Sequence, residues 1–443
     1  MVSLRFDALV VGAGPAGATA AYTLARGGAR VALVDKAVFP REKACGDLVG
    51  PRGLQVLDDL GVEIPDGLDV GDMLVVGPTG RRVRLPSFAG ASYPGRARVV
   101  VRSVLDASLA EAAVNAGAVP FTGRAAEPIE EAGRLAGFTM SSGREVRADF
   151  VIGADGAASR VGTAAGLVDP KRVLWGFAVR SYVEQRVDMP VIVLWDEEPR
   201  RALPGYGWIF PGPGGVANFG LGVGTLSDRS RGATAARLLP AFTAHLRALG
   251  LLDRDPGPDA RRPVGGWLKM GMVGTTPAAG NVLLVGDAAG LVNPLQGEGI
   301  AQALGSGRAA AQAVLADPSQ AARLYRDALA SAHLPYHRIT AALQGALLDR
   351  PRAVSALGRL LTAPGFGRAI AGGWSVFWTE LLDGAPSGPP RSVAAASMRI
   401  GKALTGRGPT AAWFEGAYPT PPSRNARAAG DVALPADVIT SAS

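Results

Sequence analysis

RFDALVVGAGPAGATAAYTLA, residues 5–25, places a short apolar run, a glycine-rich turn and an alanine-rich helical stretch in direct succession. A second apolar run, residues 30–34, follows and ends in Asp35. Strand, tight turn, helix and strand in this order are typical of a βαβ unit. The chain is therefore expected to begin with such a unit.

The glycines of this turn have separate roles. Gly12 permits the tight bend, Gly14 lets the backbone approach a pyrophosphate, and Gly17 allows the helix to pack closely on the strand. The helix N-terminus supplies free N–H groups, and Asp35 can accept hydrogen bonds from a ribose diol. The pattern predicts a Rossmann-type domain that binds either FAD or NAD. Its expected contacts are Gly12, Gly14, Pro15, Ala16, Gly17, Asp35 and Lys36.

Two later segments also end apolar strands in a turn with an aspartate. They are VIGADGAASR, residues 151–160, and NVLLVGDAAG, residues 281–290, and the latter is followed by NPLQGEGI, residues 293–300, at a helix start. With them the sequence resembles the para-hydroxybenzoate hydroxylase-like FAD superfamily, in which these segments lie along one extended FAD. The resemblance implies that Asp287 contacts the ribityl and pyrophosphate portion and that Arg102 reaches the cofactor. The further contacts that it implies are Asp155, Gly286, Pro294, Gly297, Gly299 and Ile300.

The helix that starts near Gly297 suits a flavin on physical grounds. A reduced flavin carries negative charge near N1, and the N-terminus of a helix stabilises an anion placed there. FAD is therefore the expected cofactor.

A narrower resemblance comes from FPREKACGD, residues 39–47, and from YGWIFP, residues 206–211, with GLG at 220–222. These patterns resemble the geranylgeranyl reductase family over about residues 5 to 345. The chain departs from the family pattern at Leu48, where many members have a glycine, and at Gly212, where many have a lysine that would meet a polar head group. The resemblance implies cofactor contacts at Lys43, Cys45 and Gly46, and a substrate pocket lined by Tyr206, Trp208, Phe210, Pro211 and Gly220.

Cys45 is the catalytic candidate. The resemblance places it facing the flavin, where it would shape the pocket or relay a proton, whereas a lone cysteine is otherwise a small buried apolar residue. Tyr206 and Trp208 lie two residues apart on a predicted strand and point to the same face. They therefore either both line the pocket or both belong to the core.

The expected fold class is α/β, with a Rossmann-type FAD-binding domain, an inserted antiparallel-sheet substrate domain and a C-terminal helical segment. Turn signals at Ala132-Gly133 and Ser142-Gly143 predict an antiparallel meander over residues 124–150. The expected divisions are an FAD-binding domain formed by 1–70, 97–165 and 277–345, a sheet domain formed by 71–96 and 166–276, a helical segment 346–385, and a weakly ordered tail 386–443.

Composition excludes several classes of protein. The formal charge of +8 comes from scattered arginines, without a basic face, so no nucleic-acid partner is expected. Cys45 is the only cysteine, so neither an intrachain disulfide nor a cysteine zinc cluster can form, and a cytoplasmic location is expected. No leader peptide is expected, because Met1 runs directly into an apolar strand, and no transmembrane span is expected, because no uninterrupted apolar run is long enough to cross a bilayer.

Two further parts of the sequence carry weaker signals, one for membrane contact and one for a metal site. Residues 353–383 form an apolar, amphipathic stretch with Trp374, Phe377 and Trp378, which predicts either peripheral contact with the inner face of the membrane or packing on the enzyme itself. His333 and His337 have metal-like spacing, but Pro335 lies between them and no carboxylate partner is apparent, so no metal site is expected.

The expected activity is reduction of carbon–carbon double bonds in a prenyl or other apolar substrate. The main alternative is a flavin monooxygenase that hydroxylates or epoxidises a small apolar molecule, because a fold does not decide chemistry. A flavin halogenase and a non-catalytic flavoprotein are weaker alternatives. A second dinucleotide fingerprint is absent, so the electron donor is either a transiently bound NAD(P)H or a ferredoxin-type protein.

Overall fold

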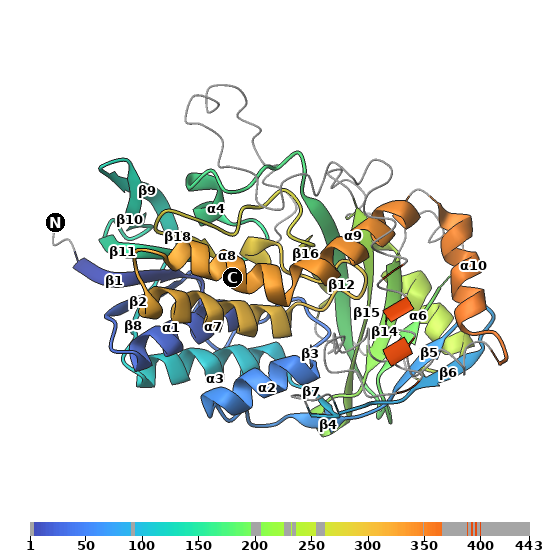
Figure 1. Ribbon diagram of the computed structural model, residues 1–443. Helices are drawn as coiled ribbons and strands as arrows, with labels where there is room; N and C mark the ends of the chain where they lie inside the picture. The colour runs from blue at the N-terminus through green and yellow to red at the C-terminus, as the bar shows by residue number, and fades with distance from the viewer. Residues whose placement is uncertain are drawn as a thin grey trace.

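Two sheets lie side by side in the computed structural model, the first on the left and the second on the right in Figure 1. Helices cover the outer sides of both sheets. The structure describes residues 4–89, 94–195, 205–225, 232, 236–253, 262–348, 350–365, 388, 391–392, 395–396 and 399.

The first sheet has eight strands, in the order β17-β18-β11-β1-β2-β8, with β10 paired to β11 and β9 paired to β10. Its central strands are parallel, and strand residues such as Leu9, Val10 and Leu33 are buried. Burial on both faces explains why residues 8–11 of β1 and 31–34 of β2 are continuous apolar runs. The strands are β1 (Leu4–Val11), β2 (Val31–Asp35), β8 (Val119–Thr122), β9 (Ala125–Glu131), β10 (Arg134–Met140), β11 (Glu145–Gly153), β17 (Ala278–Ala279) and β18 (Val282–Leu284).

Helices pack on this sheet through small side chains. Alanines and glycines of α1, among them Ala20 and Ala21, are fully buried, which lets α1 approach its neighbours closely. In Figure 1, α1 lies between α7 and α3. The helices of this half are α1 (Pro15–Arg26), α2 (Pro51–Leu60), α3 (Arg102–Asn115), α4 (Arg160–Ala164), α7 (Ile300–Ala316) and α8 (Ala321–Ala332), with the 3-10 turn η3 (Gly286–Ala289).

The meander expected over residues 124–150 is present as β9, β10 and the start of β11. Ala132 and Gly133, in the turn between β9 and β10, both have positive φ, 46° and 78°. Two positive values are typical of the tight hairpin turns whose twist matches that of the strands.

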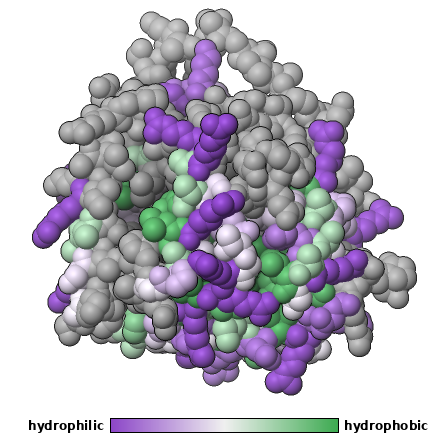
Figure 2. Space-filling view, turned by 90° about the vertical axis from the view of Figure 1, so that its right-hand side faces the viewer, coloured by the Kyte–Doolittle hydropathy of each residue, from purple (hydrophilic) through white to green (hydrophobic). Residues whose placement is uncertain are grey.

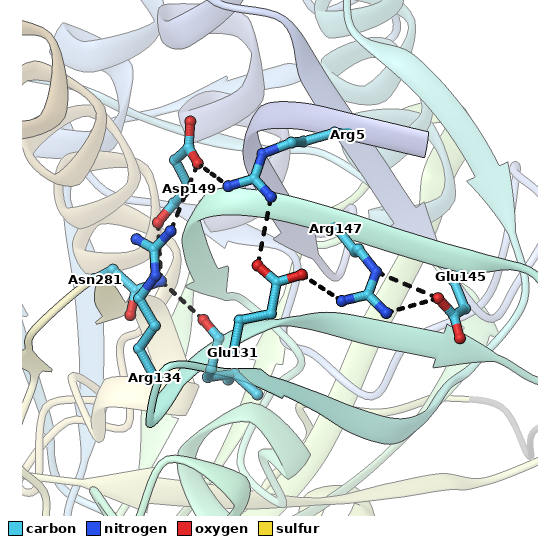
Figure 3. A network of polar contacts seen from close by, with 8 residues as sticks. Arg5, Glu131, Arg134, Glu145, Arg147, Asp149 and Asn281 are labelled. Atoms are coloured by element: carbon cyan, nitrogen blue, oxygen red, sulfur yellow. Dashed lines mark hydrogen bonds and ion pairs between the residues drawn. The ribbon is translucent and has the colours of Figure 1, made fainter. Parts of the chain in front are cut away.

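A charged network ties these strands together at the edge where β1 begins (Figure 3). Arg5 contacts Asp149 at 2.6 Å and Glu131 at 3.4 Å, and Arg147 bonds both Glu131 and Glu145. Since the glycine-rich turn follows the other end of β1, this network lies at the opposite edge from the cofactor motifs. Its side chains are partly exposed to solvent, so each pair stabilises the fold only weakly.

The second sheet has seven strands, in the order β16-β12-β15-β14-β13-β5-β6. Every neighbouring pair is antiparallel except β13 with β5. One face packs on α6 through apolar side chains that include Phe219, Leu221 and Phe242. The strands are β5 (Met73–Val76), β6 (Arg82–Leu85), β12 (Leu174–Glu184), β13 (Val191–Val193), β14 (Gly205–Phe210), β15 (Val216–Thr225) and β16 (Val264–Met270), and the covering helix is α6 (Leu239–Ala248).

Smaller elements complete the described chain. A three-stranded sheet pairs β7 with both β3 and β4. These and the remaining elements are β3 (Leu48–Val49), β4 (Leu68–Val70), β7 (Ala97–Val99), η2 (Pro213–Gly215), α9 (Leu334–Leu348) and α10 (Pro351–Leu361). The α/β fold class with its second sheet and C-terminal helices is confirmed, whereas the domain boundaries stay predictions.

The structure describes only part of the predicted C-terminal helical segment and tail. Helix α10 exposes Leu357 and Leu360, and Figure 2 shows hydrophilic and apolar side chains intermingled on the face that carries this helix. Trp374, Phe377, Trp378 and most of the predicted tail lie outside the described residues. Within the part of the chain that is described, no helix combines the length and apolar character needed to cross a membrane.

Candidate functional site

A cavity of about 670 Å³ runs from the carboxyl ends of β1 and β2 to one face of the seven-stranded sheet. Parallel sheets characteristically bind ligands at the carboxyl ends of their strands. The predicted site residues that line it are Gly12, Gly14, Pro15, Ala16, Asp35, Lys36, Lys43, Cys45, Gly46, Arg102, Asp155, Tyr206, Trp208, Phe210, Gly286, Asp287, Pro294, Gly297, Gly299 and Ile300.

Three predicted site residues do not line the cavity. A methyl group on Gly17 would lie 1.8 Å from the carbonyl oxygen of Gly12, so this glycine serves the contact between helix and strand. A methyl group on Gly220 would lie 2.5 Å from Cζ2 of Trp208, so this position makes room for the indole. Pro211 follows the last residue of β14 and is buried outside the cavity lining.

The glycine-rich turn has the shape that a pyrophosphate requires. Gly12 has φ of 103°, and a methyl group there would lie 2.2 Å from the carbonyl oxygen of Ala154. A methyl group on Gly14, by contrast, would meet only Nη2 of Arg41, at 3.5 Å. The space over Gly14 is therefore open to the cavity, next to the N-terminus of α1.

Asp35 holds the turn in place. Its two carboxylate oxygens accept hydrogen bonds from the backbone N–H groups of Ala13, at 2.8 Å, and Ala37, at 2.9 Å. Because each oxygen has a further lone pair and the side chain lines the cavity, Asp35 can also accept from a ribose hydroxyl.

Cationic side chains surround the next part of the cavity. Arg102 makes two hydrogen bonds of 2.8 Å to the buried carboxylate of Asp106, and Arg41 lies 3.0 Å from the same carboxylate. Burial opposes the charge on Arg102, but Asp106 and Cys45 together outweigh it and raise the pKa of Arg102. Burial lowers the pKa of Lys43, while the nearby Asp287 opposes that fall.

Two aspartates follow the ends of β11 and β18. Asp155 accepts hydrogen bonds from the Ser159 hydroxyl at 2.5 Å and from the Arg160 and Val161 N–H groups at 2.7 and 3.1 Å, so it satisfies free N–H groups at the start of α4, where Ser159 is the N-cap. Asp287 faces the cavity. Burial raises the pKa of Asp287, and Lys43, Arg102 and Lys269 oppose that rise.

Cys45 lies where the cofactor side of the cavity meets the second sheet. Its sulfur accepts a hydrogen bond from the N–H of Asp47 at 3.3 Å. Burial raises the pKa of the Cys45 thiol, although Arg102 lowers it. The residue is thus a neutral thiol that lines the cavity.

A buried cluster behind Cys45 joins the two halves of the molecule. Nδ2 of Asn218 donates to the carbonyl of Cys45 at 2.8 Å and to Oδ2 of Asp47 at 2.7 Å, and Oδ1 accepts from Nε1 of Trp208 at 2.9 Å. The hydroxyl of Tyr182 donates to the same oxygen of Asp47 at 2.6 Å. Asn218 therefore links Cys45 to Trp208 of the seven-stranded sheet.

Sequence reasoning missed this cluster and also Arg41. Asp47 belongs to the quoted 39–47 pattern, and its positive φ of 63° shows that the backbone there is constrained. Nothing in the sequence singles out Asn218, because its role depends on the pairing that sets Phe210 of β14 and Tyr182 of β12 opposite it.

Tyr206 connects the second sheet to the loop before α7. Its hydroxyl donates to the carbonyl of Gln296, and burial raises the pKa of Tyr206. Helix α7 begins at Ile300 with Gly299 as its N-cap, so its free N–H groups are directed at this part of the cavity.

The residues present fit FAD. An open glycine turn at a helix N-terminus suits a pyrophosphate, Asp35 suits a ribose, and the start of α7 suits the pyrimidine edge of a flavin. Arg41, Lys43 and Arg102 supply the positive charge that two phosphates need. When bound there, FAD supplies hydride-transfer chemistry at the junction of the two sheets.

Of the two histidines with metal-like spacing, His337 contacts backbone carbonyls. The ring nitrogens of His337 lie 3.0 Å from the carbonyl oxygens of His333 and Leu291. Burial lowers the pKa of His333 well below its usual value. His337 is thus held by backbone carbonyls within the helical region.

Comparisons with known proteins agree with this geometry. A family model described as FAD binding domain matches residues 5–323. The chain is 37% identical over 323 residues to a menaquinone reductase of Mycolicibacterium smegmatis, covering 70% of this chain and 76% of that protein. It is 34% identical over 337 residues to digeranylgeranylglycerophospholipid reductase 2 of Methanopyrus kandleri, covering 73% and 81%.

Among solved structures, a geranylgeranyl bacteriochlorophyll reductase-like protein of Thermoplasma acidophilum matches with a TM-score of 0.68. The match covers 89% of this chain and all of that one, at 23% identity. At this identity the likeness concerns the fold alone.

Proposed function

Since the chain belongs to the FAD-dependent oxidoreductase family that includes the geranylgeranyl reductases, we propose that it reduces carbon–carbon double bonds in the prenyl chain of an apolar lipid. The two relatives above are named reductases of menaquinone and of a digeranylgeranyl phospholipid, and both of these molecules carry prenyl chains. The proposal concerns this shared chain and not a particular lipid.

One observation carries the proposal, namely the difference in charge between the two sides of the cavity. The cofactor side holds Arg41, Lys43, Arg102 and Asp287. The lining residues from the seven-stranded sheet carry no charge. They are Gly176, Phe177, Ala178, Gly205, Tyr206, Trp208, Phe210, Gly222, Val223, Gly224, Leu268 and Met270. A surface of this kind suits a hydrocarbon chain and offers no partner to a phosphate.

The residues of the chain have limited but definable tasks in such a reaction. An isolated alkene is a poor electrophile, so most of the acceleration must come from positioning the chain and excluding water. Trp208 and Phe210 supply apolar contact area beside Cys45. We propose that the Cys45 thiol, kept neutral by burial, shapes this space and holds a proton next to the reacting carbon.

The source of electrons lies outside the chain. We propose that NAD(P)H, bound only transiently, or a ferredoxin-type protein reduces the bound flavin between turnovers.

Mass spectrometry after incubation of the protein with a cell lipid extract and an excess of reductant tests the proposed reaction. We expect a lipid that gains two hydrogens both with and without air. A lipid that gains one oxygen, and only in air, would instead identify a monooxygenase.

Peripheral contact with a membrane is a separate proposal, supported by the apolar substrate class and by the exposed Leu357 and Leu360 of α10. Flotation of the intact protein with liposomes tests it. Protein that stays in the soluble fraction would exclude this contact.

A further inference from the structure

Four neighbouring positions on the cavity face of the seven-stranded sheet carry no side chain larger than a methyl group. Gly176 of β12 pairs with Gly224 of β15, and Ala178 pairs with Gly222 two residues along. All four line the cavity. Neighbouring strands are about 4.8 Å apart and two residues along a strand span about 7 Å, so the bare patch is about as wide as one hydrocarbon chain.

The backbone does not require glycine at position 222. Residue 222 has ordinary extended φ, and the pairing of β15 with β12 runs from Val216 to Thr225 without a bulge. Glycine weakens a strand interior, and it is typically found at a bulge, at a bend, or where a ligand or another backbone approaches closely. The regular pairing leaves close approach as the remaining reason.

Among the residues that the structure describes, no atom makes that approach. A methyl group on Gly222 would lie 3.9 Å from its nearest neighbours, which belong to Phe177, Ala178 and Trp208. The space over Gly222 therefore belongs to the cavity and is available to a ligand.

Other glycines of β14 and β15 have protein atoms close to the position that a methyl group would take. A methyl group on Gly220 would meet the Trp208 ring at 2.5 Å, one on Gly207 would meet the Phe242 ring at 2.0 Å, and one on Gly205 would meet the Gly222 carbonyl at 1.9 Å. Each makes room for a part of the protein. Among the glycines of β14 and β15 for which neighbouring atoms are described, Gly222 alone opens onto unfilled space.

The sides of the patch are apolar or aromatic. Tyr206, which pairs with Gly222, and Trp208 flank it on β14. On the other side Met270 reaches to within 3.0 Å of a methyl group placed on Gly176. Met270 therefore covers Gly176, and the open floor of a narrow trough lies over Gly222 and Ala178, between aromatic rings and a flexible thioether.

We propose that Gly222, together with Ala178 opposite it, determines substrate specificity by keeping this trough open for a linear prenyl chain. This inference rests on the proposed function and adds where the chain lies and what limits its width. It predicts that side-chain volume at positions 222 and 178 controls binding of the chain without affecting the cofactor.

The test uses FAD-loaded protein and geranylgeraniol, with binding measured from the change in the flavin absorption spectrum. We expect Gly222→Leu to raise the Kd for geranylgeraniol by about tenfold or more, and Gly222→Ala to raise it less than Gly222→Leu. Ala178→Leu, across the same trough, should raise the Kd in the same way. It provides a second variant if Gly222→Leu does not fold. FAD content should match the wild type in all three.

The other possible outcomes distinguish failure of this inference from failure of the proposed function. Wild-type affinity in both leucine variants would overturn the inference while leaving the proposed function intact. A folded variant that loses FAD would show that the flavin ring, and not the substrate, lies over Gly222, and would also overturn it. If the wild type binds neither geranylgeraniol nor a menaquinone with a four-unit prenyl chain, the proposed function fails and the inference fails with it.

Discussion

The two sides of the cavity are built by different means. On the cofactor side, backbone groups and charged side chains do the work, as in the open turn at Gly14, the carboxylate of Asp35 and the pair of Arg102 with Asp106. On the proposed substrate side, the space is defined by aromatic rings and by glycines, which have no side chain. The first side is specific for a cofactor through polar contacts, whereas the second can select a substrate only through shape.

The largest effect is expected on the cofactor side, at Gly14. Gly14→Val should abolish FAD retention, because the branched side chain would occupy the space that the pyrophosphate needs. The protein should still fold, since the only nearby protein atom is the end of the Arg41 side chain. Flavin absorbance per protein after gel filtration measures the effect.

Gly305→Ala in α7 is the matched control for that variant. No atom lies within 4 Å of a methyl group at position 305, so FAD should be retained and stability should rise by about 0.5–1 kcal/mol. Full FAD occupancy in Gly14→Val would show that the cofactor lies elsewhere.

A smaller effect is expected where the two sides are joined, at Asn218. Asn218→Leu removes the hydrogen bonds to Cys45, Asp47 and Trp208, so FAD should stay bound while hydride transfer to the substrate slows by about tenfold or more. The buried groups left without partners should also cost about 1–3 kcal/mol of stability each.

Asn281→Leu separates positioning from stability. Asn281 also donates two hydrogen bonds, both of 2.8 Å, to backbone carbonyls in the first sheet. The Asn281→Leu variant should lose stability in the same manner without slowing hydride transfer to the substrate. Equal transfer rates in the two variants would remove Asn218 from the positioning role.

At Cys45 the expected loss is about tenfold, which corresponds to roughly 1.4 kcal/mol in the barrier. Cys45→Ser should keep FAD bound, because no predicted phosphate or ribose contact changes, but a hydroxyl is smaller and more strongly hydrated than a thiol. The measurement is reoxidation of reduced flavin by substrate without oxygen, at equal flavin content. Rates equal to the wild type would make Cys45 a packing residue.

The smallest effect on turnover is expected at Lys269 on β16, which is fully buried and whose ammonium has no hydrogen-bond partner among the described residues. Burial lowers the pKa of Lys269 to about 8, against 10.5 when unfolded. Between these values the unfolded chain binds more protons, so stability should rise from about pH 8 to about pH 10.5. The difference between these two pKa values corresponds to roughly 3 kcal/mol in the free energy of unfolding.

Lys269→Met should therefore be more stable than the wild type at pH 7, and this advantage should vanish by about pH 10.5. Denaturant unfolding of both proteins across this range measures the difference. An advantage that does not change with pH would show that the lysine is not held at a lowered pKa.

The sequence could predict the first side of the cavity better than the second for a physical reason. Gly12, Gly14 and Asp35 belong to one local unit, in which a strand, a turn and a helix determine each position. The α/β fold class follows from the same unit and from the later sheet-like segments.

The second side depends on register between strands. Tyr206 and Trp208 were predicted through family resemblance, but Gly220 and Gly222 look alike in the sequence. Only the pairing shows that Trp208 fills the space over Gly220, while Gly222 faces the cavity. The role of Asn218 was missed for the same reason.

The most direct test of the proposed function follows one substrate on the reduced protein under argon. Menaquinol with a four-unit prenyl chain, whose ring is already reduced and cannot accept electrons from the flavin, is mixed with the protein, the ring is then oxidised in air, and the product is fragmented in a mass spectrometer. We expect flavin absorption to return under argon and two added hydrogens to remain on the prenyl chain. A chain of unchanged mass, or an added oxygen that appears only when air is present during the reaction, would contradict prenyl reduction.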